Sequence, residues 1–128
     1  MTSAGRRIAG WKLPLGERRR LLDAFAPRYG RVVADHVTLR FGTDAGTSLP
    51  AETEGEVAGE ADDGEGVQAL VVRIGGTTER GDGSYFHITW SLGPGRSAKE
   101  SNDVIRERGW RALLSPIPIR IEPGSWSG

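Results

Sequence analysis

The 128-residue chain contains no cysteine and no long run of apolar residues. Without cysteine there can be no disulfide, thiolate nucleophile or cysteine-based zinc site, which agrees with a cytoplasmic protein. No apolar stretch approaches the ~18 residues of a membrane-spanning helix. The basic residues near the N-terminus also lack the apolar stretch that follows them in a secretory signal. We therefore expect a cytoplasmic protein without membrane contact, folded as one domain over residues 1–128.

Basic and acidic residues balance at 17 each, but they are unevenly distributed along the chain. Residues 1–40 hold nine Arg or Lys and three Asp or Glu, whereas residues 41–72 hold eight Asp or Glu and no Arg or Lys. Either both runs are solvated faces, or the folded domain has a basic flank that attracts an anionic ligand.

The hydrophobic pattern predicts an α+β fold with a mostly antiparallel sheet. Apolar residues at helical spacing favour helices over residues 16–29 and 97–108. Alternation and β-branched residues favour strands over residues 32–41, 54–62, 67–74, 85–92 and 117–121. The Asp- and Gly-rich residues 63–66 predict a turn that joins two of these strands as a hairpin.

The only two histidines of the chain occupy two copies of one pattern, His-apolar-Thr-apolar. The copies are HVTL at residues 36–39 and HITW at residues 87–90, and their histidines are 51 positions apart. Side chains alternate across a strand, so the apolar positions are expected to face the core while His and Thr project together from the opposite face. Two such strands across a cleft would present two imidazoles and two hydroxyls to one point.

These four side chains, His36, Thr38, His87 and Thr89, suit the hydrolysis of a phosphodiester. A neutral imidazole can accept a proton from an attacking water, and an imidazolium can donate one to the departing alkoxide. The usual imidazole pKa of about 6.5 allows both forms near neutral pH. The Thr hydroxyls can donate to the non-bridging phosphoryl oxygens, where charge accumulates. The set requires no metal ion and no cofactor.

The paired motifs resemble the 2H phosphoesterase superfamily, which is defined by two His-x-Thr-x motifs in one chain. The likeness covers roughly residues 33–103 and is closest to the 2′,3′-cyclic phosphodiesterase domain of plant and fungal tRNA ligases, with SAKESN at residues 97–102 a less specific part of it. The resemblance implies a compact bilobed fold with pseudo-two-fold symmetry, flanking helices and one motif in each lobe. It also implies metal-independent opening of 2′,3′-cyclic phosphates at RNA ends or of nucleotides, in RNA repair or processing. We expect the protein to be a monomer.

By the same resemblance, the two histidines are the acid and the base. We expect His87 to be the base that activates water, His36 to be the acid, and ring opening to leave a 2′-phosphate; exchanged roles of the histidines and the other ring-opening product stay open. An RNA ligase or kinase would act in the same pathway. The 51 positions between the motifs are few for the superfamily and imply a more open cleft, so other substrates such as ADP-ribose 1″,2″-cyclic phosphate stay open.

Four residues near the motifs are candidates for contacting the substrate, each with a structural alternative. Tyr85 shares the predicted strand face of His87 and could stack on a nucleobase or cap the sheet edge. Trp11 could line the nucleobase side, although packing is the better explanation. Arg40 could contact a phosphate or be solvated at a strand end. Arg80 lies on a Gly-rich loop that could close over the substrate or form a disordered hairpin tip.

Three polar residues follow the second motif at the start of a predicted helix. Lys99, Ser101 and Asn102 could help to hold an anion there, or they could simply cap the helix.

Two other functions fit parts of the sequence. A non-catalytic RNA-binding module would use the basic helix for backbone contacts, but binding alone does not require two titratable groups. A metal hydrolase would combine both histidines with Asp35, but alternation points Asp35 toward the core.

Overall fold

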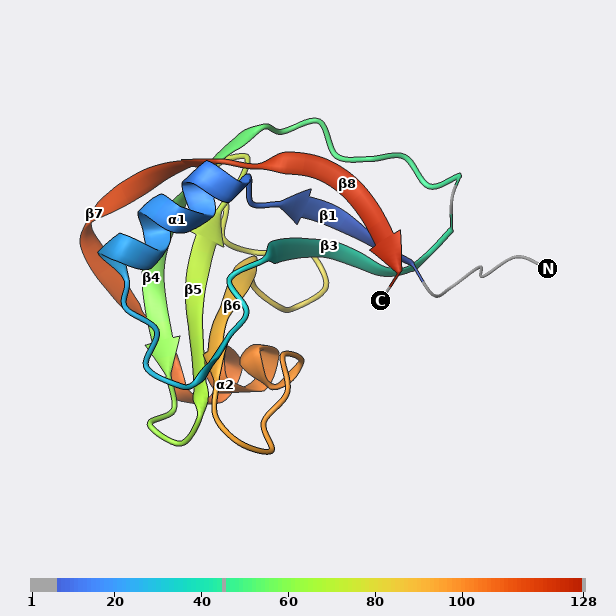
Figure 1. Ribbon diagram of the computed structural model, residues 1–128. Coiled ribbons are helices and arrows are strands. Elements are labelled where there is room, and N and C mark those ends of the chain that lie inside the picture. Colours follow the sequence, from blue (N-terminus) through green and yellow to red (C-terminus); the bar gives the residue numbers. More distant parts are fainter. Residues whose placement is uncertain (1–6, 45, 128) are drawn as a thin grey trace.

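Eight strands and two helices make up the described part of the chain, residues 7–44 and 46–127 of the computed structural model (Figure 1). In chain order they are β1 (Arg7–Lys12), α1 (Leu15–Ala24), β2 (Arg31–Val32), β3 (His36–Thr43), β4 (Glu54–Asp62), β5 (Val67–Arg73), β6 (His87–Leu92), α2 (Glu100–Arg108), β7 (Arg111–Arg120) and β8 (Glu122–Ser127). Every pairing between these strands is antiparallel, which confirms the predicted α+β class.

The strands form two sheets. The smaller has the order β3-β1-β8 and the larger the order β2-β6-β5-β4-β7. Helix α1 lies over the larger sheet in Figure 1, while α2 lies at its lower end and contacts β4 and β5. Strands β3 and β6 belong to different sheets yet contact each other. None of the described helices is long and apolar enough to cross a membrane.

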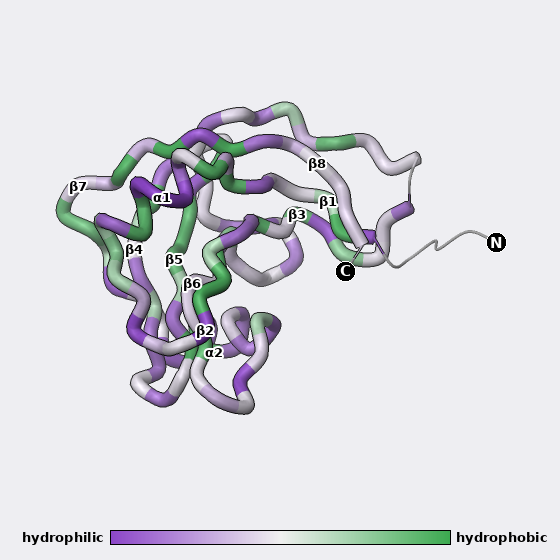
Figure 2. Tube along the Cα trace, viewed as in Figure 1, coloured by the Kyte–Doolittle hydropathy of each residue, from purple (hydrophilic) through white to green (hydrophobic). Residues whose placement is uncertain are grey.

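The main hydrophobic core joins the two sheets and α1. Trp11 and Val37 enter it from the smaller sheet, Leu21 from α1, and Ile88 and Trp90 from the larger sheet. A second cluster on the other face of the larger sheet is covered by α2; its buried members are Ala61, Val67, Ala69, Val71, Leu92, Val104 and Ile105. Both faces of β5 and β6 are therefore buried, and apolar segments concentrate in these two strands in Figure 2.

Helix α1 is shorter than the predicted range 16–29, because it ends at Ala24. Phe25 has extended backbone angles, φ −125° and ψ 97°. Pro27 follows two residues later, and a proline disfavours helical backbone at the residue before it.

Strand β1 was not predicted because Gly10 interrupts its apolar pattern. Gly10 lies opposite Thr38 in the register of β1 and β3. A Cβ atom at Gly10 would come within 2.2 Å of the Val37 carbonyl oxygen, so the close approach of the two backbones requires glycine. The short closing strand predicted at residues 117–121 was also wrong in extent, because the chain forms β7 and then β8 there.

The strand predicted over residues 32–41 is divided at Ala34, whose φ is +45°. Before this residue, β2 pairs with β6 of the larger sheet, and after it β3 pairs with β1 of the smaller sheet. Positive φ is uncommon for a residue with a side chain and redirects the strand. The segment around Ala34 is thus the crossover from one sheet to the other.

The predicted alternation of β6 holds for Ile88 and Trp90, which lie in the main core, but fails at Leu92, which lies in the second cluster. The register of β5 and β6 shifts here: Gln68 pairs with Ser91 and Ala69 pairs with Thr89. Trp90 is the extra residue of this bulge, and one extra residue moves the following side chains to the opposite face.

Candidate functional site

The two His-x-Thr motifs meet at the crossover between the sheets. The backbone amide of Ala34 donates to the carbonyl of Thr89 at 3.0 Å, and that of Val33 donates to the carbonyl of Trp90 at 2.9 Å. The chain that leads into the first motif is therefore bonded to the backbone of the second. His36 follows two residues after Ala34, and its charge contributes to lowering the pKa of His87.

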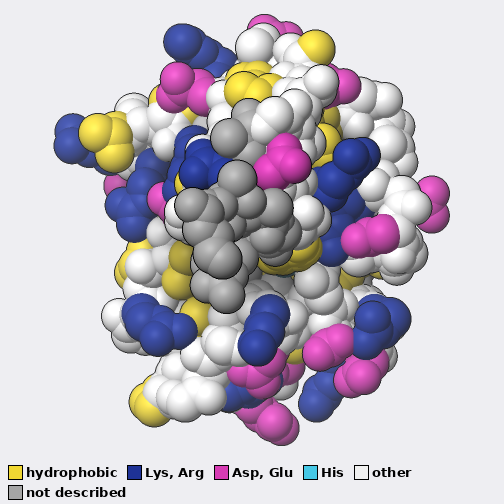
Figure 3. Space-filling model, turned by 90° about the vertical axis from the view of Figure 1, so that its right-hand side faces the viewer, with side chains coloured by type: hydrophobic (Ala, Val, Ile, Leu, Met, Phe, Trp, Pro, Cys, Tyr) yellow, Lys and Arg dark blue, Asp and Glu magenta, His cyan; other side chains and the backbone are white. Residues whose placement is uncertain are grey.

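The crossover is held in place from α1. Arg18 donates from Nε to the Ala34 carbonyl at 2.9 Å and from Nη2 to the Val33 carbonyl at 3.3 Å. Arg20, on the same helix, bonds to Glu17 and to the carbonyl of Pro118. Two arginines of the basic helix thus bind the protein itself, which weakens the prediction of a basic flank for nucleic acid. On the face drawn in Figure 3, charges of both signs are interspersed.

His87, at the start of β6, is 9% exposed, so the expectation that the motif histidines project from an open face is wrong for this copy. Its Nδ1 lies 2.9 Å from the carbonyl oxygen of Tyr85. Because a carbonyl can only accept, Nδ1 carries the hydrogen and Nε2 keeps a free lone pair in the neutral ring. Burial, together with the charges of Arg80 and His36, lowers the pKa of His87 to about 4. The ring is therefore neutral at physiological pH.

His36, at the start of β3, has a different environment. Its Nδ1 lies 3.0 Å from Oδ2 of Asp35, and Lys12 Nζ lies 2.5 Å from the same oxygen. The imidazole also packs edge-on against Trp126, with ring centroids 5.0 Å apart. Burial lowers the pKa of His36, whereas its hydrogen bond to Asp35 opposes that shift. Among residues 7–44 and 46–127, no hydrogen bond to Nε2 of this histidine is found.

The prediction that Asp35 faces the core was wrong. Its side chain is 48% exposed and contacts His36, because the positive φ of Ala34 interrupts the strand on which alternation was counted. Within the described residues, no group of three His, Asp or Glu side chains is placed to hold a metal ion.

The two threonines are both buried, at 7% exposure each, but they are used differently. The Thr89 hydroxyl donates to the carbonyl of Ala98 at 3.2 Å and lies 2.9 Å from Oγ of Ser101 in α2. Thr38 differs: its backbone carbonyl accepts from Arg80 Nη1, and no hydrogen bond of its hydroxyl is found among residues 7–44 and 46–127. Thr38 is thus the one of the pair whose hydroxyl is available to a ligand.

Arg80 reaches the same region from the loop between β5 and β6. Its side chain is 5% exposed, and Nη1 donates to the carbonyl of Thr38 at 3.4 Å. The guanidinium also lies over the ring of Phe41, 5.5 Å from its centroid, and pairs with Asp82 at 3.1 Å. Hydrogen bonds from Ser84 and Arg80 lower the pKa of Asp82 to about 2, so its carboxyl group is ionised. A largely buried cation therefore lies beside both motifs.

The other predicted contacts are placed as follows. Trp11 is 1% exposed and its indole N–H donates to the carbonyl of Glu52, so it packs in the core and offers no surface to a substrate. Tyr85 packs against the second hydrophobic cluster, and its carbonyl orients His87. Arg40 and Lys99 are exposed.

Within α2, Ser101 is fully buried against Thr89. Asn102 Oδ1 is buried without a hydrogen-bond partner. Neither caps the helix, since the N-cap residue is Lys99 and makes no side-chain capping bond.

Sequence reasoning missed the roles of Asp35, Lys12 and Trp126. Asp35 precedes His36 directly, but strand alternation placed it on the wrong face. Lys12 and Trp126 lie 24 and more positions from His36 in the chain, and only the pairing of β1 with β3 and with β8 brings their strands together.

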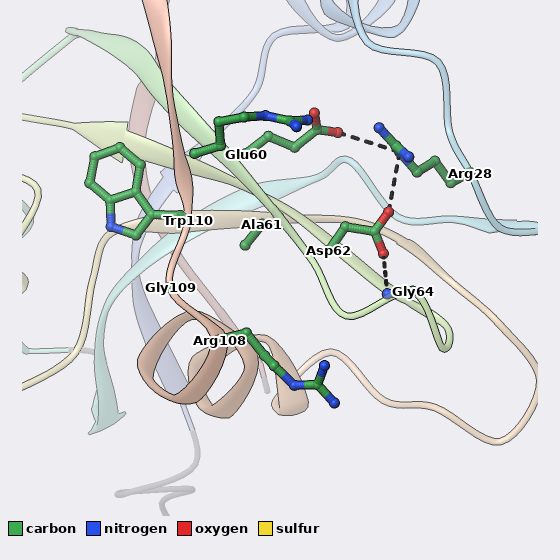
Figure 4. A pocket seen from close by; sticks show the side chains of 9 residues that line it. Arg28, Glu60, Ala61, Asp62, Gly64, Arg108, Gly109 and Trp110 are labelled. Carbon is green, nitrogen blue, oxygen red and sulfur yellow. Dashed lines mark hydrogen bonds and ion pairs between the residues drawn. The ribbon is translucent and has the colours of Figure 1, made fainter.

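A separate hollow of about 600 Å³ lies beside the end of β4 and the C-terminal end of α2 (Figure 4). Arg28 lines this hollow and pairs with Asp62 at 3.2 Å and with Glu60 at 3.8 Å. The charge of Arg28 is therefore neutralised within the protein. Neither motif contributes to this hollow.

The sequence matches no known family model, and no curated protein or solved structure is significantly similar to it.

Proposed function

We propose that the protein is a metal-independent 2′,3′-cyclic phosphodiesterase of the 2H type, which acts in the cytoplasm on RNA ends or on the cyclic nucleotides derived from them. The observation that carries the proposal is that the two imidazoles interact electrostatically and that each has its Nδ1 hydrogen-bonded, which leaves Nε2 for a ligand. Both free nitrogens can then exchange protons with one bound phosphate. In this proposal the two sheets, each of which carries one motif, take the place of the two lobes that the resemblance implies.

His87 is the general base and His36 the general acid in this proposal. His87 is neutral above a pKa of about 4, so its Nε2 can accept a proton from the attacking water. His36 has an anionic neighbour in Asp35, which favours the protonated ring that an acid needs.

In the reaction, the water oxygen bonds to phosphorus while its proton goes to His87 Nε2. The bond from phosphorus to O3′ breaks, and the proton of His36 Nε2 goes to O3′. The product is a 2′-phosphate with a free 3′-hydroxyl. His87 returns its proton to solvent, and His36 takes one up before the next turnover.

Arg80 and the Thr38 hydroxyl supply positive charge and a donor to the non-bridging oxygens, where negative charge grows in the transition state. In the free protein Arg80 pairs with Asp82 and contacts the Thr38 carbonyl. A bound phosphate would replace water near these groups and strengthen their interaction with it. Thr89 acts indirectly, since its hydroxyl joins β6 to α2.

The proposal is tested by incubating the protein with the four 2′,3′-cyclic nucleotides, with an RNA that ends in a 2′,3′-cyclic phosphate and with ADP-ribose 1″,2″-cyclic phosphate, all in the presence of EDTA. We expect hydrolysis of the 2′,3′-cyclic phosphates to 2′-phosphates, distinguished from 3′-phosphates by chromatography. If only ADP-ribose 1″,2″-cyclic phosphate is hydrolysed, that compound is the substrate and the proposed RNA-derived substrates are wrong. Binding of RNA without turnover of any compound would favour the non-catalytic module instead.

A further inference from the structure

Lys12, Asp35, His36 and Trp126 form a connected cluster on one face of the smaller sheet. Asp35 is the centre of it, because a single oxygen, Oδ2, lies 3.0 Å from His36 Nδ1 and 2.5 Å from Lys12 Nζ. Burial opposes ionisation of Asp35, yet hydrogen bonds from Lys12 and His36 hold the pKa of its carboxyl below the ordinary value. Asp35 is therefore an anion shared between a cation and the imidazole.

The position of Lys12 is set by its strand register and by a contact with Trp126. It lies opposite His36 in the register of β1 and β3, and its Nζ is 4.4 Å from the centroid of Trp126. Trp126 contacts the imidazole of His36 as well. The indole thus keeps the ammonium close to Asp35 and His36, a contact of the cation–π type.

From this arrangement we infer that Asp35 and Lys12 are positioning residues that set the tautomer and the protonation of His36 in opposite directions. Asp35 accepts the Nδ1 hydrogen, which holds Nε2 toward the substrate and favours the imidazolium. Lys12 shares the carboxylate and, as a nearby positive charge, disfavours the imidazolium. The opposing effects of Asp35 and Lys12 therefore set the highest pH at which His36 is still protonated and can donate a proton to the leaving oxygen.

Among the described residues, the Nδ1 atom of His87 is not bonded to a carboxylate that is shared with a lysine. Its Nδ1 is held by the neutral carbonyl of Tyr85, and the charges that act on it are those of Arg80 and His36, both of which lower its pKa. The charged groups that act on His36 are Asp35 from its own chain segment and Lys12 from β1. The titratable ring of His87 lies near it on β6, and β8 presents the ring of Trp126 to it and places Glu122 opposite Lys12 in the register. The two halves of the site therefore differ in electrostatics although their motifs are alike.

The inference rests on the proposed function only for the role of His36 as acid; the control of its protonation can be measured without turnover. Because the chain has two histidines, protein labelled with ¹⁵N-histidine and free of a histidine tag gives two sets of ring signals. The variant His87→Gln assigns them. Ring titrations of the wild type, Asp35→Asn, Lys12→Met and the control Arg19→Ala then report the tautomer and pKa of His36 directly.

We expect neutral His36 in the wild type to carry its hydrogen on Nδ1. Asp35→Asn should lower the pKa of His36 and mix the tautomers, whereas Lys12→Met, which keeps an apolar stem, should raise that pKa. Arg19, an exposed residue of α1, should change neither. The alkaline limb of kcat/KM for a 2′,3′-cyclic nucleotide should move in the same two directions.

Unchanged His36 titration in both Asp35→Asn and Lys12→Met, or shifts of the same sign, would overturn the inference. If Asp35→Asn does not fold, the Lys12→Met titration decides alone: an unchanged or lower pKa of His36 in that variant would overturn the inference, and an upward shift supports it only if His36 keeps its hydrogen on Nδ1, because loss of burial would also raise the pKa. Opposite shifts in protein that hydrolyses no cyclic phosphate would uphold the control of His36 and refute the proposed activity, so the two failures are distinct.

Discussion

The backbone amide of Ala34 donates to the carbonyl of Thr89 at 3.0 Å, which bonds the approach to one His-x-Thr motif to the interior of the other. The positive φ of Ala34 then turns the chain from the larger sheet into the smaller one. This one bond and this one turn explain how two motifs from separate sheets come to lie side by side, as the proposed phosphate site requires.

The pH dependence of activity should be bell-shaped with its optimum on the acidic side of neutrality. His87 must be neutral, and its pKa is about 4; His36 must be protonated, and burial places its pKa below the ordinary 6.5. The productive pair of forms is most abundant between these two values. Initial rates at low substrate between pH 3 and pH 9 give the kcat/KM profile of the free enzyme. An optimum above pH 7.5 would contradict the assignment.

The stability of the fold should fall on mild acidification. His87 has a folded pKa of about 4 against an ordinary value of 6.5, so the unfolded chain binds a proton that the folded protein excludes. The stabilisation is complete above pH 6.5 and is lost as the pH falls toward 4, by roughly 3 kcal/mol in the free energy of unfolding. Urea unfolding at pH 7.5 and pH 4.5 measures it, and His87→Gln should remove most of the difference. An equal pH dependence in that variant would assign the loss to other groups.

Thr38→Val and Thr89→Val should have opposite consequences. No hydrogen bond of the Thr38 hydroxyl is found within the described residues, so Thr38→Val should lower kcat/KM and leave the unfolding midpoint nearly unchanged. Thr89→Val leaves Ser101 and the Ala98 carbonyl without their partner and should destabilise the protein by about 1–3 kcal/mol. Thr89→Ser, which retains the hydroxyl, is the matched control. Equal stability losses at both positions would refute the distinction.

Replacement of Arg80 should lower the rate of hydrolysis and shift its pH dependence. Replacement by methionine removes the buried charge while keeping an apolar stem over Phe41, and we expect kcat/KM to fall by roughly 10²-fold or more, as for loss of a donor to a developing oxyanion. Because Arg80 lowers the pKa of His87, the acidic limb of the pH profile should move to higher pH in Arg80→Met. A rate loss without that movement would place Arg80 outside the site.

The neighbouring arginines of α1 provide a structural test of the crossover. Arg18 donates to the carbonyls of Val33 and Ala34, whereas the next residue, Arg19, is exposed. Arg18→Ala should lower both the free energy of unfolding, by about 1.5–3 kcal/mol, and the activity. Arg19→Ala should change neither. If the two variants behave alike, the crossover does not depend on this anchor.

Local patterns in the sequence predicted the class of fold and the hairpin of β4 and β5, because apolar alternation and a Gly-rich turn are properties of short segments. They did not predict β1, where Gly10 is required by the backbone of another strand, or the turn at Ala34, since alanine gives no signal of positive φ. The error at Asp35 followed from that turn, because alternation was counted through it.

The burial of the second motif was missed for a related reason. Alternation correctly assigned Ile88 and Trp90 to the main core. It could not show that Ser101 of α2 contacts Thr89 on the opposite face of β6, or that His87 is buried as well. Contacts between distant segments determine this burial, and with it the pKa of His87 and the engagement of Thr89.

The measurement that tests the account most directly is the initial rate of 2′,3′-cyclic nucleotide hydrolysis, with EDTA present, by the wild type, His36→Gln, His87→Gln and Arg19→Ala. Circular dichroism confirms that each variant is folded. The account predicts turnover by the wild type and Arg19→Ala, and a loss of roughly 10²–10⁴-fold in each histidine variant, the range expected for removal of a general acid or base. Wild-type rates in both histidine variants, or no turnover by the wild type, would contradict it.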